Sequence, residues 1–376
     1  MVAAQTIVIG AGPAGLGVAA ELIGRGLPCT VLDSRDVVGS SWADRYDGLH
    51  LHTARWLSGS PGIRIPPSVG PWVSRDDYHH YLGYYARRRG VRVDFGITAE
   101  RVDRVDGRWR VDTSAGSMAC DHVVVATGLC RRPATPRWPG MARFTGTLLH
   151  SAAYRAPGPF RGRQVLVVGA GNSGTEIAVE LLDVGARVSV SVRTPPGIVR
   201  RSTLGVPSQA IGLAVHPLPE AVLNPVMGMF RRVSVPDMSG YGLPAPEAPY
   251  SQFLRTGTIP VLDYGFVSAV RDRRIRVVPA VKGFDGDRVL LADDRTCVPD
   301  AVICATGYQA GLESLVGHLG VLDGRGMPVA GDRTLPQPHG LHFVGITLTL
   351  TGLLHEIAGQ ARHVAAAIAA GPVGVR

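Results

Sequence analysis

Two short glycine-rich loops have the residue spacing that binds the pyrophosphate of a dinucleotide. The first is Gly-Ala-Gly-Pro-Ala-Gly at residues 10–15, and the second is Gly-Ala-Gly-Asn-Ser-Gly at residues 169–174. In such a loop the first glycine permits a tight turn, the second lets the backbone approach the phosphates, and the third lets a helix pack closely on the preceding strand. The N-terminus of that helix then faces the phosphates. Two such loops could hold a hydride donor and its acceptor.

A predicted strand precedes each loop and a predicted helix follows it. The β-branched residues 6–9 precede the first loop, after which a helical pattern runs through Leu22. The apolar residues 165–168 precede the second loop, and a helical pattern runs through Leu182. This context separates a dinucleotide loop from a chance match to the glycine pattern.

The residue after the second strand of each unit indicates which ribose the unit binds. Strand 29–32 ends at Asp33, at about the twenty-residue spacing at which a carboxylate can hydrogen-bond a ribose 2′-hydroxyl. Strand 187–192 ends instead at Arg193 and Thr194, and an arginine there can pair with a 2′-phosphate. The second loop is therefore predicted to prefer NADPH to NADH. A solvated surface arginine is the alternative interpretation of Arg193.

Two later segments repeat each other and define the domains. Residues 121–128 and 300–307 are both predicted to be a buried strand that ends in Ala-Thr-Gly. We therefore expect an α/β fold with two Rossmann-like dinucleotide-binding domains, the second inserted into the first. The first would comprise residues 1–150 and 305–376, and the second residues 160–300, with a proline- and glycine-rich substrate cover at about 200–250.

Composition excludes several other classes of protein. The 376 residues are 45% hydrophobic, and their 39 basic and 30 acidic residues give a net charge of +9. The basic residues are scattered, so we expect no nucleic-acid partner. Lys282 is the sole lysine, which argues against lysine-based chemistry. The five cysteines form no C-x-x-C pair or metal-like cluster, which fits a reduced cytoplasmic location without a metal. No signal peptide or membrane-spanning segment is predicted.

Between the two units lies the most specific motif of the chain. Residues 144–154 fit the pattern F-x-G-x-x-x-H-x-x-x-Y, with Phe144, Gly146, His150 and Tyr154 at the defined positions. With this motif the chain resembles the class B flavin-containing monooxygenases, and within them the YUCCA-type plant members and related bacterial members. The likeness covers almost the whole length and includes residues 39–46, 49–53, 258–263 and 305–308.

The resemblance implies an activity. FAD would occupy the first domain and NADPH the second; NADPH reduces FAD, O2 forms a C4a-hydroperoxyflavin, and a small organic substrate is oxygenated. Baeyer-Villiger relatives usually end the motif with tryptophan, so Tyr154 favours N- or S-oxygenation or YUCCA-like oxidative decarboxylation. Baeyer-Villiger oxygenation is one alternative. A flavin-dependent pyridine-nucleotide reductase is another, which the missing redox cysteine pair argues against. A non-enzymatic nucleotide sensor is a third.

The loops and the resemblance together predict the site residues. The FAD-binding set is Gly10, Gly12, Pro13, Ala14, Gly15, Asp33, Ser34, Trp42, His52, Val102, Thr127, Gly128 and Leu353. The NADPH-binding set is Gly169, Gly171, Asn172, Ser173, Gly174, Arg193 and Thr194. His52, Thr53 and His150 are the candidate catalytic residues, although His150 fits a structural hydrogen-bonded histidine equally well. The stretch 53–55 stands where the family places an active-site asparagine, and Trp42 fits a core aromatic as well as a flavin contact.

Local patterns predict several further elements. Residues 49–52 alternate leucine and histidine as in a strand, residues 77–89 form an amphipathic helix with a tyrosine stripe, and residues 102–111 form a hairpin around Asp106-Gly107. Residues 342–345 are a predicted strand, a helix begins at Gly352-Leu353, and another helix lies around residues 221–231. In the family, the helix after Gly352 directs its N-terminus toward the flavin. The sequence leaves the oligomeric state open between a monomer and a homodimer.

Overall fold

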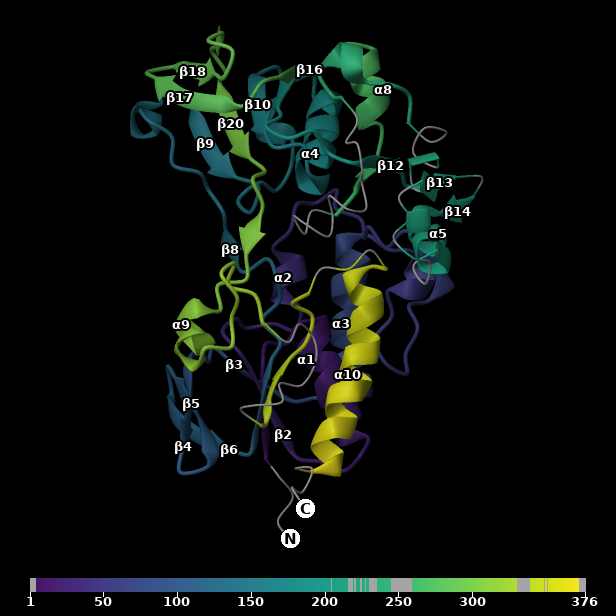
Figure 1. The fold of residues 1–376 in the computed structure, drawn as a ribbon, viewed down its shortest axis with the longest axis vertical. Coiled ribbons are helices and arrows are strands. Elements are labelled where there is room, and N and C mark those ends of the chain that lie inside the picture. Colours follow the sequence, from purple (N-terminus) through teal and green to yellow (C-terminus); the bar gives the residue numbers. More distant parts are fainter. Residues whose placement is uncertain are drawn as a thin grey trace. The chain divides into compact units, whose positions relative to one another are not determined.

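The chain divides into two compact units that are built on the same plan. The computed structural model describes residues 5–371 apart from 204, 216–218, 220, 224, 227, 230–234, 245–258, 330–338, 348 and 350. Unit 1 comprises Met1–Asp44, Thr53–Arg132 and Tyr308–Arg376, and unit 2 comprises Arg45–His52 and Pro133–Gly307. Each unit contains a five-stranded parallel sheet and a three-stranded antiparallel sheet (Figure 1). The predicted α/β fold with two Rossmann-like domains is confirmed.

The parallel sheet of unit 1 has the strand order β22-β7-β1-β2-β3. Its strands are β1 (Thr6–Ile9), β2 (Cys29–Asp33), β3 (Val93–Phe95), β7 (His122–Val125) and β22 (Leu341–Phe343). Every residue of β1 is buried, as expected for a central parallel strand that is covered on both faces. The strands at residues 6–9 and 122–125, which are rich in valine and isoleucine, therefore lie inside the sheet rather than at its edges.

Three helices accompany this sheet, namely α1 (Pro13–Ile23), α3 (Arg75–Arg88) and α10 (Leu353–Ala370). α1 packs against both α10 and α3 (Figure 1). The predicted tyrosine stripe of α3 is confirmed, since Tyr78, Tyr81 and Tyr85 are all buried. The Ser74 side chain caps α3 by accepting a hydrogen bond from the Asp77 N–H, as expected for a serine at an N-cap.

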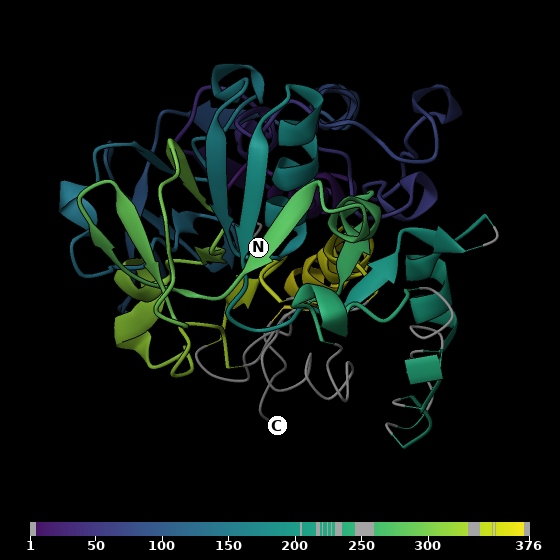
Figure 2. The same ribbon diagram turned by 90° about the horizontal axis from the view of Figure 1, so that it is seen from above.

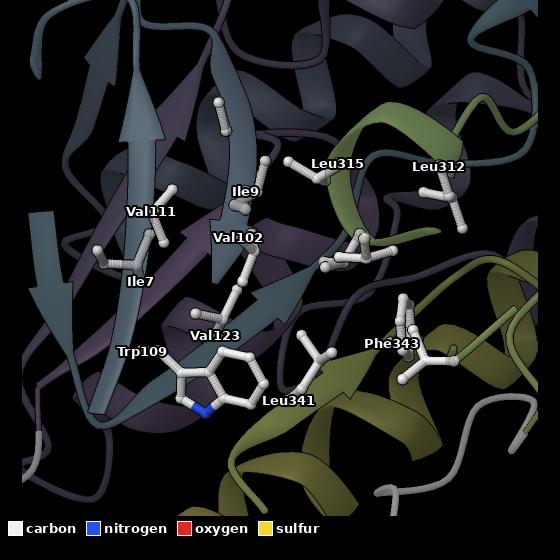
Figure 3. Packing of buried hydrophobic residues seen from close by; sticks show 14 of the residues in the cluster. Ile7, Ile9, Val102, Trp109, Val111, Val123, Leu312, Leu315, Leu341 and Phe343 are labelled. Atoms are coloured by element: carbon white, nitrogen blue, oxygen red, sulfur yellow. The ribbon is translucent and has the colours of Figure 1, made fainter. Parts of the chain in front are cut away.

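The antiparallel sheet of unit 1 contains β4 (Ala99–Val105), β5 (Arg108–Thr113) and β6 (Gly116–Cys120). Asp106 and Gly107, with φ of 49° and 80°, form the two-residue turn between β4 and β5, so the predicted hairpin is confirmed. Figure 3 shows the core that joins this sheet to the parallel one. Val102 from β4 and Trp109 from β5 lie in that core with Leu341 and Phe343 from β22.

The parallel sheet of unit 2 has the order β16-β11-β10-β20-β9. Its strands are β9 (Thr147–His150), β10 (Gln164–Val168), β11 (Arg187–Ser191), β16 (Ile275–Val278) and β20 (Ala301–Cys304). Helix α4 (Asn172–Asp183) follows β10 and lies beside these strands (Figure 2), and α8 (Phe266–Arg271) packs on α4. The antiparallel sheet contains β17 (Val281–Asp285), β18 (Arg288–Leu291) and β19 (Thr296–Cys297).

Shorter elements complete the two units. The helices are α2 (Ser40–Ala43), α5 (Ser208–Val215), α9 (Glu313–Val316), η1 (Arg55–Leu57), η2 (Pro67–Val69), η3 (Met141–Arg143), η4 (Gly158–Phe160), η5 (Ser239–Tyr241) and η6 (Gly317–Leu319). The strands are β8 (Arg132–Pro133), β12 (Ile198–Arg200), β13 (Ser202–Thr203), β14 (Val206–Pro207), β15 (Val261–Asp263) and β21 (Tyr308–Gln309). None of the helices in the described ranges has the length and apolar character that crossing a membrane requires.

One local prediction is wrong and two fall partly outside the described residues. Residues 49–52 form no strand, although Leu49 and Leu51 are buried while His50 is exposed. Side-chain contacts, rather than hydrogen bonds to a neighbouring strand, hold this segment. The predicted alternation between buried and exposed side chains is therefore observed, but the predicted strand is not. The helix predicted around 221–231 and the substrate cover at 200–250 lie partly outside the described residues. Residue 258, the first of the segment 258–263 that shares the family likeness, also lies outside them.

Candidate functional site

In the first glycine-rich loop, two glycines serve the fold and one faces open space. Gly10 has a φ of +110°, and a Cβ on it would lie 2.6 Å from the Ala126 carbonyl oxygen. A Cβ on Gly15 would lie 1.8 Å from the Gly10 carbonyl oxygen. A Cβ on Gly12 would meet nothing within 4 Å. The first and third glycines are therefore required for packing, while the second keeps clear the place where a pyrophosphate would lie.

The second loop repeats this geometry. Gly169 has a φ of +106°, with its Cβ position 2.5 Å from the Ala305 carbonyl oxygen, and the Cβ position of Gly174 is 2.0 Å from the Gly169 carbonyl oxygen. Gly171, the N-cap of α4, again has open space at its Cβ position. The Asn172 side chain holds β15 by accepting a hydrogen bond of 2.9 Å from the Leu262 N–H. Both loops thus combine a rigid turn, a clear space and a helix N-terminus, and a dinucleotide fits each of them.

The residues at the ends of β2 and β11 differ in charge, with an acid at the end of β2 and a cation after β11. The Asp33 carboxylate accepts hydrogen bonds from the N–H groups of Ala11, at 2.7 Å, and Arg35, at 2.9 Å. It therefore ties the end of β2 to the glycine-rich loop, with Ser34 exposed beside it. Arg193 and Thr194 follow β11 and are exposed. A cation and a hydroxyl are thus available to a ligand at the second loop.

The other predicted FAD-binding residues of unit 1 occupy several environments. Pro13 and Ala14 begin α1, Leu353 begins α10, and Gly128 has a φ of 75° after β7. The hydroxyl oxygen of Thr127 is buried and has no hydrogen-bond partner among the described residues, as fits a group that a bound cofactor would engage. Trp42 is half-buried and meets the Tyr78 ring edge-on, with 4.7 Å between centroids. The Val102 side chain lies wholly in the core. The candidate catalytic residue Thr53 has its Oγ1 2.6 Å from Ser58 Oγ.

The first half of the motif at residues 144–154 packs the edge of unit 2. The Phe144 ring meets the Phe284 ring of β17 with 5.3 Å between centroids. A Cβ on Gly146 would lie 2.6 Å from the Phe144 ring and 2.8 Å from the Asp300 carbonyl oxygen. Glycine at this position therefore lets β9 join the sheet beneath the phenylalanine ring.

The second half of the motif is a hydrogen-bonded corner. His150 Nδ1 accepts from the Ala152 N–H at 3.0 Å, so Nε2 carries the proton and donates to the Gly307 carbonyl oxygen at 3.0 Å. Burial lowers the pKa of His150, and Arg45 acts in the same direction, so the ring is neutral. Tyr154 is buried and donates to Glu180 at 3.0 Å. All four defined positions of the motif thus have a structural function in unit 2, and the catalytic function of His150 stays a prediction.

Helix α4 carries a cluster of polar groups that the sequence did not predict as part of a site. Glu176 is 7% exposed; it accepts a hydrogen bond from the Tyr46 hydroxyl, and its Oε1 lies 2.6 Å from His52 Nε2. His52 therefore belongs to unit 2, while its neighbour Thr53 belongs to unit 1. A pair of glutamates four residues apart in α4 was the only signal in the sequence, because the partners of Glu176 lie more than a hundred residues away in the chain.

The second glutamate of the cluster, Glu180, lies one turn further along α4. Burial raises the pKa of Glu180 to about 7, opposed by the hydrogen bond from Tyr154. A Cβ on Gly48 would lie 1.7 Å from Glu180 Oε1, so the carboxylate fills the space beside that glycine. Glu180 thus contacts both the segment 45–52 and the end of the 144–154 motif.

Two parallel sheets that match around the strand before the glycine-rich loop are typical of an oxidoreductase that binds two dinucleotides. Residues 7–205 match the family model described as pyridine nucleotide-disulphide oxidoreductase. The chain is 33% identical to indole-3-pyruvate monooxygenase YUCCA1 of Oryza sativa subsp. japonica, over 91% of this chain and 86% of that protein. A flavin monooxygenase variant from Stenotrophomonas maltophilia has a similar structure, with a TM-score of 0.73 and 25% identity over 98% of this chain and 99% of that one.

The chain belongs to the class B flavin-containing monooxygenases. It is an FAD- and NADPH-dependent monooxygenase that uses O2 and a small-molecule substrate, as the sequence predicted. ε-Caprolactone-bound cyclohexanone monooxygenase, with a TM-score of 0.73 and 18% identity over 98% of this chain and 88% of that one, shares the fold.

Replacing Glu180 with glutamine should stabilise the protein in a pH-dependent way. The folded pKa of about 7 lies above the ordinary 4.5, so the stability that protonated Glu180 contributes is complete below about pH 4.5 and is lost as the pH rises to about 7. Glutamine cannot ionise and can still accept from Tyr154. We expect Glu180→Gln to raise the free energy of unfolding by about 1–2 kcal/mol at pH 8 and by much less near pH 4.5.

Urea denaturation followed by circular dichroism at both pH values measures this difference. Asp287→Asn is the control, because Asp287 is exposed in the turn between β17 and β18 and its replacement should not change the pH profile. Equal gains for Glu180→Gln at the two pH values would contradict the assigned burial of a protonated carboxyl group.

Proposed function

We propose that this monooxygenase oxidatively decarboxylates an aromatic 2-oxo acid of the indole-3-pyruvate class. The observation that carries the proposal is the 33% identity, over 91% of this chain, with a protein named for that substrate. Tyr154 at the end of the 144–154 motif, in place of the tryptophan usual in Baeyer-Villiger relatives, supports it. The likeness to cyclohexanone monooxygenase is confined to the fold and does not favour a ketone substrate.

The proposed reaction converts R–CO–COOH, O2, NADPH and H⁺ into R–COOH, CO2, NADP⁺ and H2O. The bond between the oxo carbon and the carboxyl carbon breaks, and one oxygen atom of O2 is bonded to the former oxo carbon. The other oxygen atom leaves as water, with two electrons taken from NADPH. Bound FAD supplies the activation of O2, which amino-acid side chains cannot provide.

The residues of the chain would bind and orient the two cofactors. We assign the open spaces at Gly12 and Gly171 to the pyrophosphates of FAD and NADPH, at the N-termini of α1 and α4. The buried Thr127 hydroxyl would hydrogen-bond FAD. Arg193 and Thr194, exposed after β11, would bind the 2′-phosphate of NADPH. The other residues that the sequence assigns to FAD and NADPH stay predictions. For Val102 the backbone would make the contact, because its side chain lies in the core.

The substrate assignment is tested with purified protein, indole-3-pyruvate, NADPH and ¹⁸O2. We expect NADPH oxidation that the substrate stimulates, and release of CO2. The other product should be an acid that is one carbon shorter than the substrate and carries one ¹⁸O atom. Indole-3-lactate, which has no oxo group, is the control and should not stimulate the reaction. A product that gains oxygen without losing carbon, or hydrogen peroxide as the sole product, would rule out this substrate class.

The assignment of Arg193 is tested by its replacement with glutamine. Loss of a charge-assisted pair with the 2′-phosphate should raise the KM for NADPH about ten- to a hundredfold and leave the KM for NADH unchanged. Arg187→Gln is the matched control, because Arg187 is an exposed arginine at the opposite end of β11. Steady-state kinetics with both nucleotides measure the effect. Equal rises for NADPH and NADH would show that Arg193 does not contact the 2′-phosphate.

A further inference from the structure

Residues Arg45–His52, here called the crossing segment, belong to unit 2 although the chain on both sides belongs to unit 1. The segment has no helix or strand of its own, so other contacts hold it. The Asp47 N–H donates to the Arg155 carbonyl oxygen at 2.8 Å, and Gly48 packs against Glu180. The segment is therefore docked on unit 2 at several points, rather than spanning it loosely.

Glu176 provides the side-chain anchor of the crossing segment. Its carboxylate, 7% exposed, engages Tyr46 near one end of the segment and His52 at the other. Tyr46 is 3% exposed; its burial and the nearby Glu176 raise its pKa, which keeps the hydroxyl protonated and able to donate. A buried carboxylate needs such donors, because removing it from water without partners is unfavourable. One acid thus joins both ends of the segment to α4.

A cation next to this anchor balances its charge. The Arg201 guanidinium lies over the Tyr264 ring, 4.3 Å from its centroid, and an Arg201 Nη2 donates to the Leu51 carbonyl oxygen at 3.4 Å. Glu176 raises the pKa of Arg201 against the effect of burial, which means that the two charges attract each other. The carboxylate of Glu176 and the backbone of the crossing segment are therefore held by the same group of side chains.

The position of Glu176 on α4 connects this anchor to the second glycine-rich loop. Gly171 is the N-cap of α4, and Glu176 lies in the same helix within two turns of it. The crossing segment follows α2, which carries Trp42, and continues directly into Thr53. Trp42 is a predicted FAD-binding residue and Thr53 is a predicted catalytic residue. A rigid α4 with a docked segment thus links the chain around the predicted flavin site to the helix that begins at the NADPH loop.

We propose that Glu176 is a positioning residue for the monooxygenase reaction, which locks the crossing segment to α4 so that NADPH binding orders the chain leading to Trp42 and Thr53. The proposal rests on the proposed assignment of NADPH to the second loop. Its effect is on the efficiency of electron transfer from NADPH to FAD, because that transfer depends on how well the two cofactors are oriented. Glu176 itself needs no contact with either cofactor.

Hydrogen exchange and anaerobic flavin reduction, measured on the FAD-loaded full chain, test the proposal. In the parent protein, NADP⁺ should slow exchange of the amides of residues 45–52. Glu176→Ala should speed their exchange at least tenfold, abolish the response to NADP⁺, and slow flavin reduction by NADPH about tenfold with little change in the Kd of NADPH. Peptides from β10 should keep their protection. Glu176→Gln, which retains an acceptor for Tyr46, should recover part of each effect.

Two further variants keep the test decisive. Asp183→Asn, at the exposed end of α4, is the control and should match the parent. Tyr46→Phe removes one donor without removing the ring, so it should reproduce part of the Glu176→Ala effect even if the alanine variant folds poorly. Unchanged exchange in residues 45–52, or faster exchange spread evenly through unit 2, would overturn the proposal. Neither readout requires oxygen insertion, so failure of the 2-oxo acid substrate would leave this test intact.

Discussion

The structure depends on two places where a helix approaches the strand before it closely enough to exclude a Cβ atom. In each, the third glycine of the loop faces the carbonyl oxygen of the first, at Gly15 with Gly10 and at Gly174 with Gly169. Any side chain there would push α1 or α4 away from its sheet, and the helix N-terminus would no longer face the space beside the second glycine. The open space that we assign to a pyrophosphate therefore follows from a packing constraint.

Both units contain this constraint, which explains why their sheets match around the loop. The two units differ in other places. Both sheets place the strand before the loop in the centre, with the strand before Ala-Thr-Gly on one side of it. The two units differ after the second strand, where Asp33 bonds back to its own loop while Arg193 remains exposed. They differ again at β9, where the 144–154 motif closes the edge of unit 2. The motif that identifies the family is thus, in this protein, mainly a packing and hydrogen-bonding feature.

Local patterns in the sequence predicted the parts of the fold that short-range forces decide. The two loops, the Asp106-Gly107 hairpin and the tyrosine stripe of α3 were all predicted, because turn geometry and helical periodicity act over a few residues. Residues 49–52 of the crossing segment were predicted as a strand, because leucine and histidine alternate there. The contacts of the segment come instead from Glu176, Arg155 and Arg201. Nothing near residues 45–52 in the sequence indicates those partners, so neither the segment's unit nor the role of Glu176 could be predicted.

The central claim is that the first loop holds FAD and the second holds NADPH, each at a glycine that the fold itself does not require. It is tested most directly by adding a side chain at those two glycines, where a Cβ meets nothing within 4 Å, and recording the absorbance of the purified proteins before and after anaerobic addition of NADPH. We expect Gly12→Val to fold but to lack flavin, and Gly171→Val to keep its flavin but not to be reduced by NADPH. A Gly12→Val protein that retains flavin, or a Gly171→Val protein reduced at the parent rate, would contradict it.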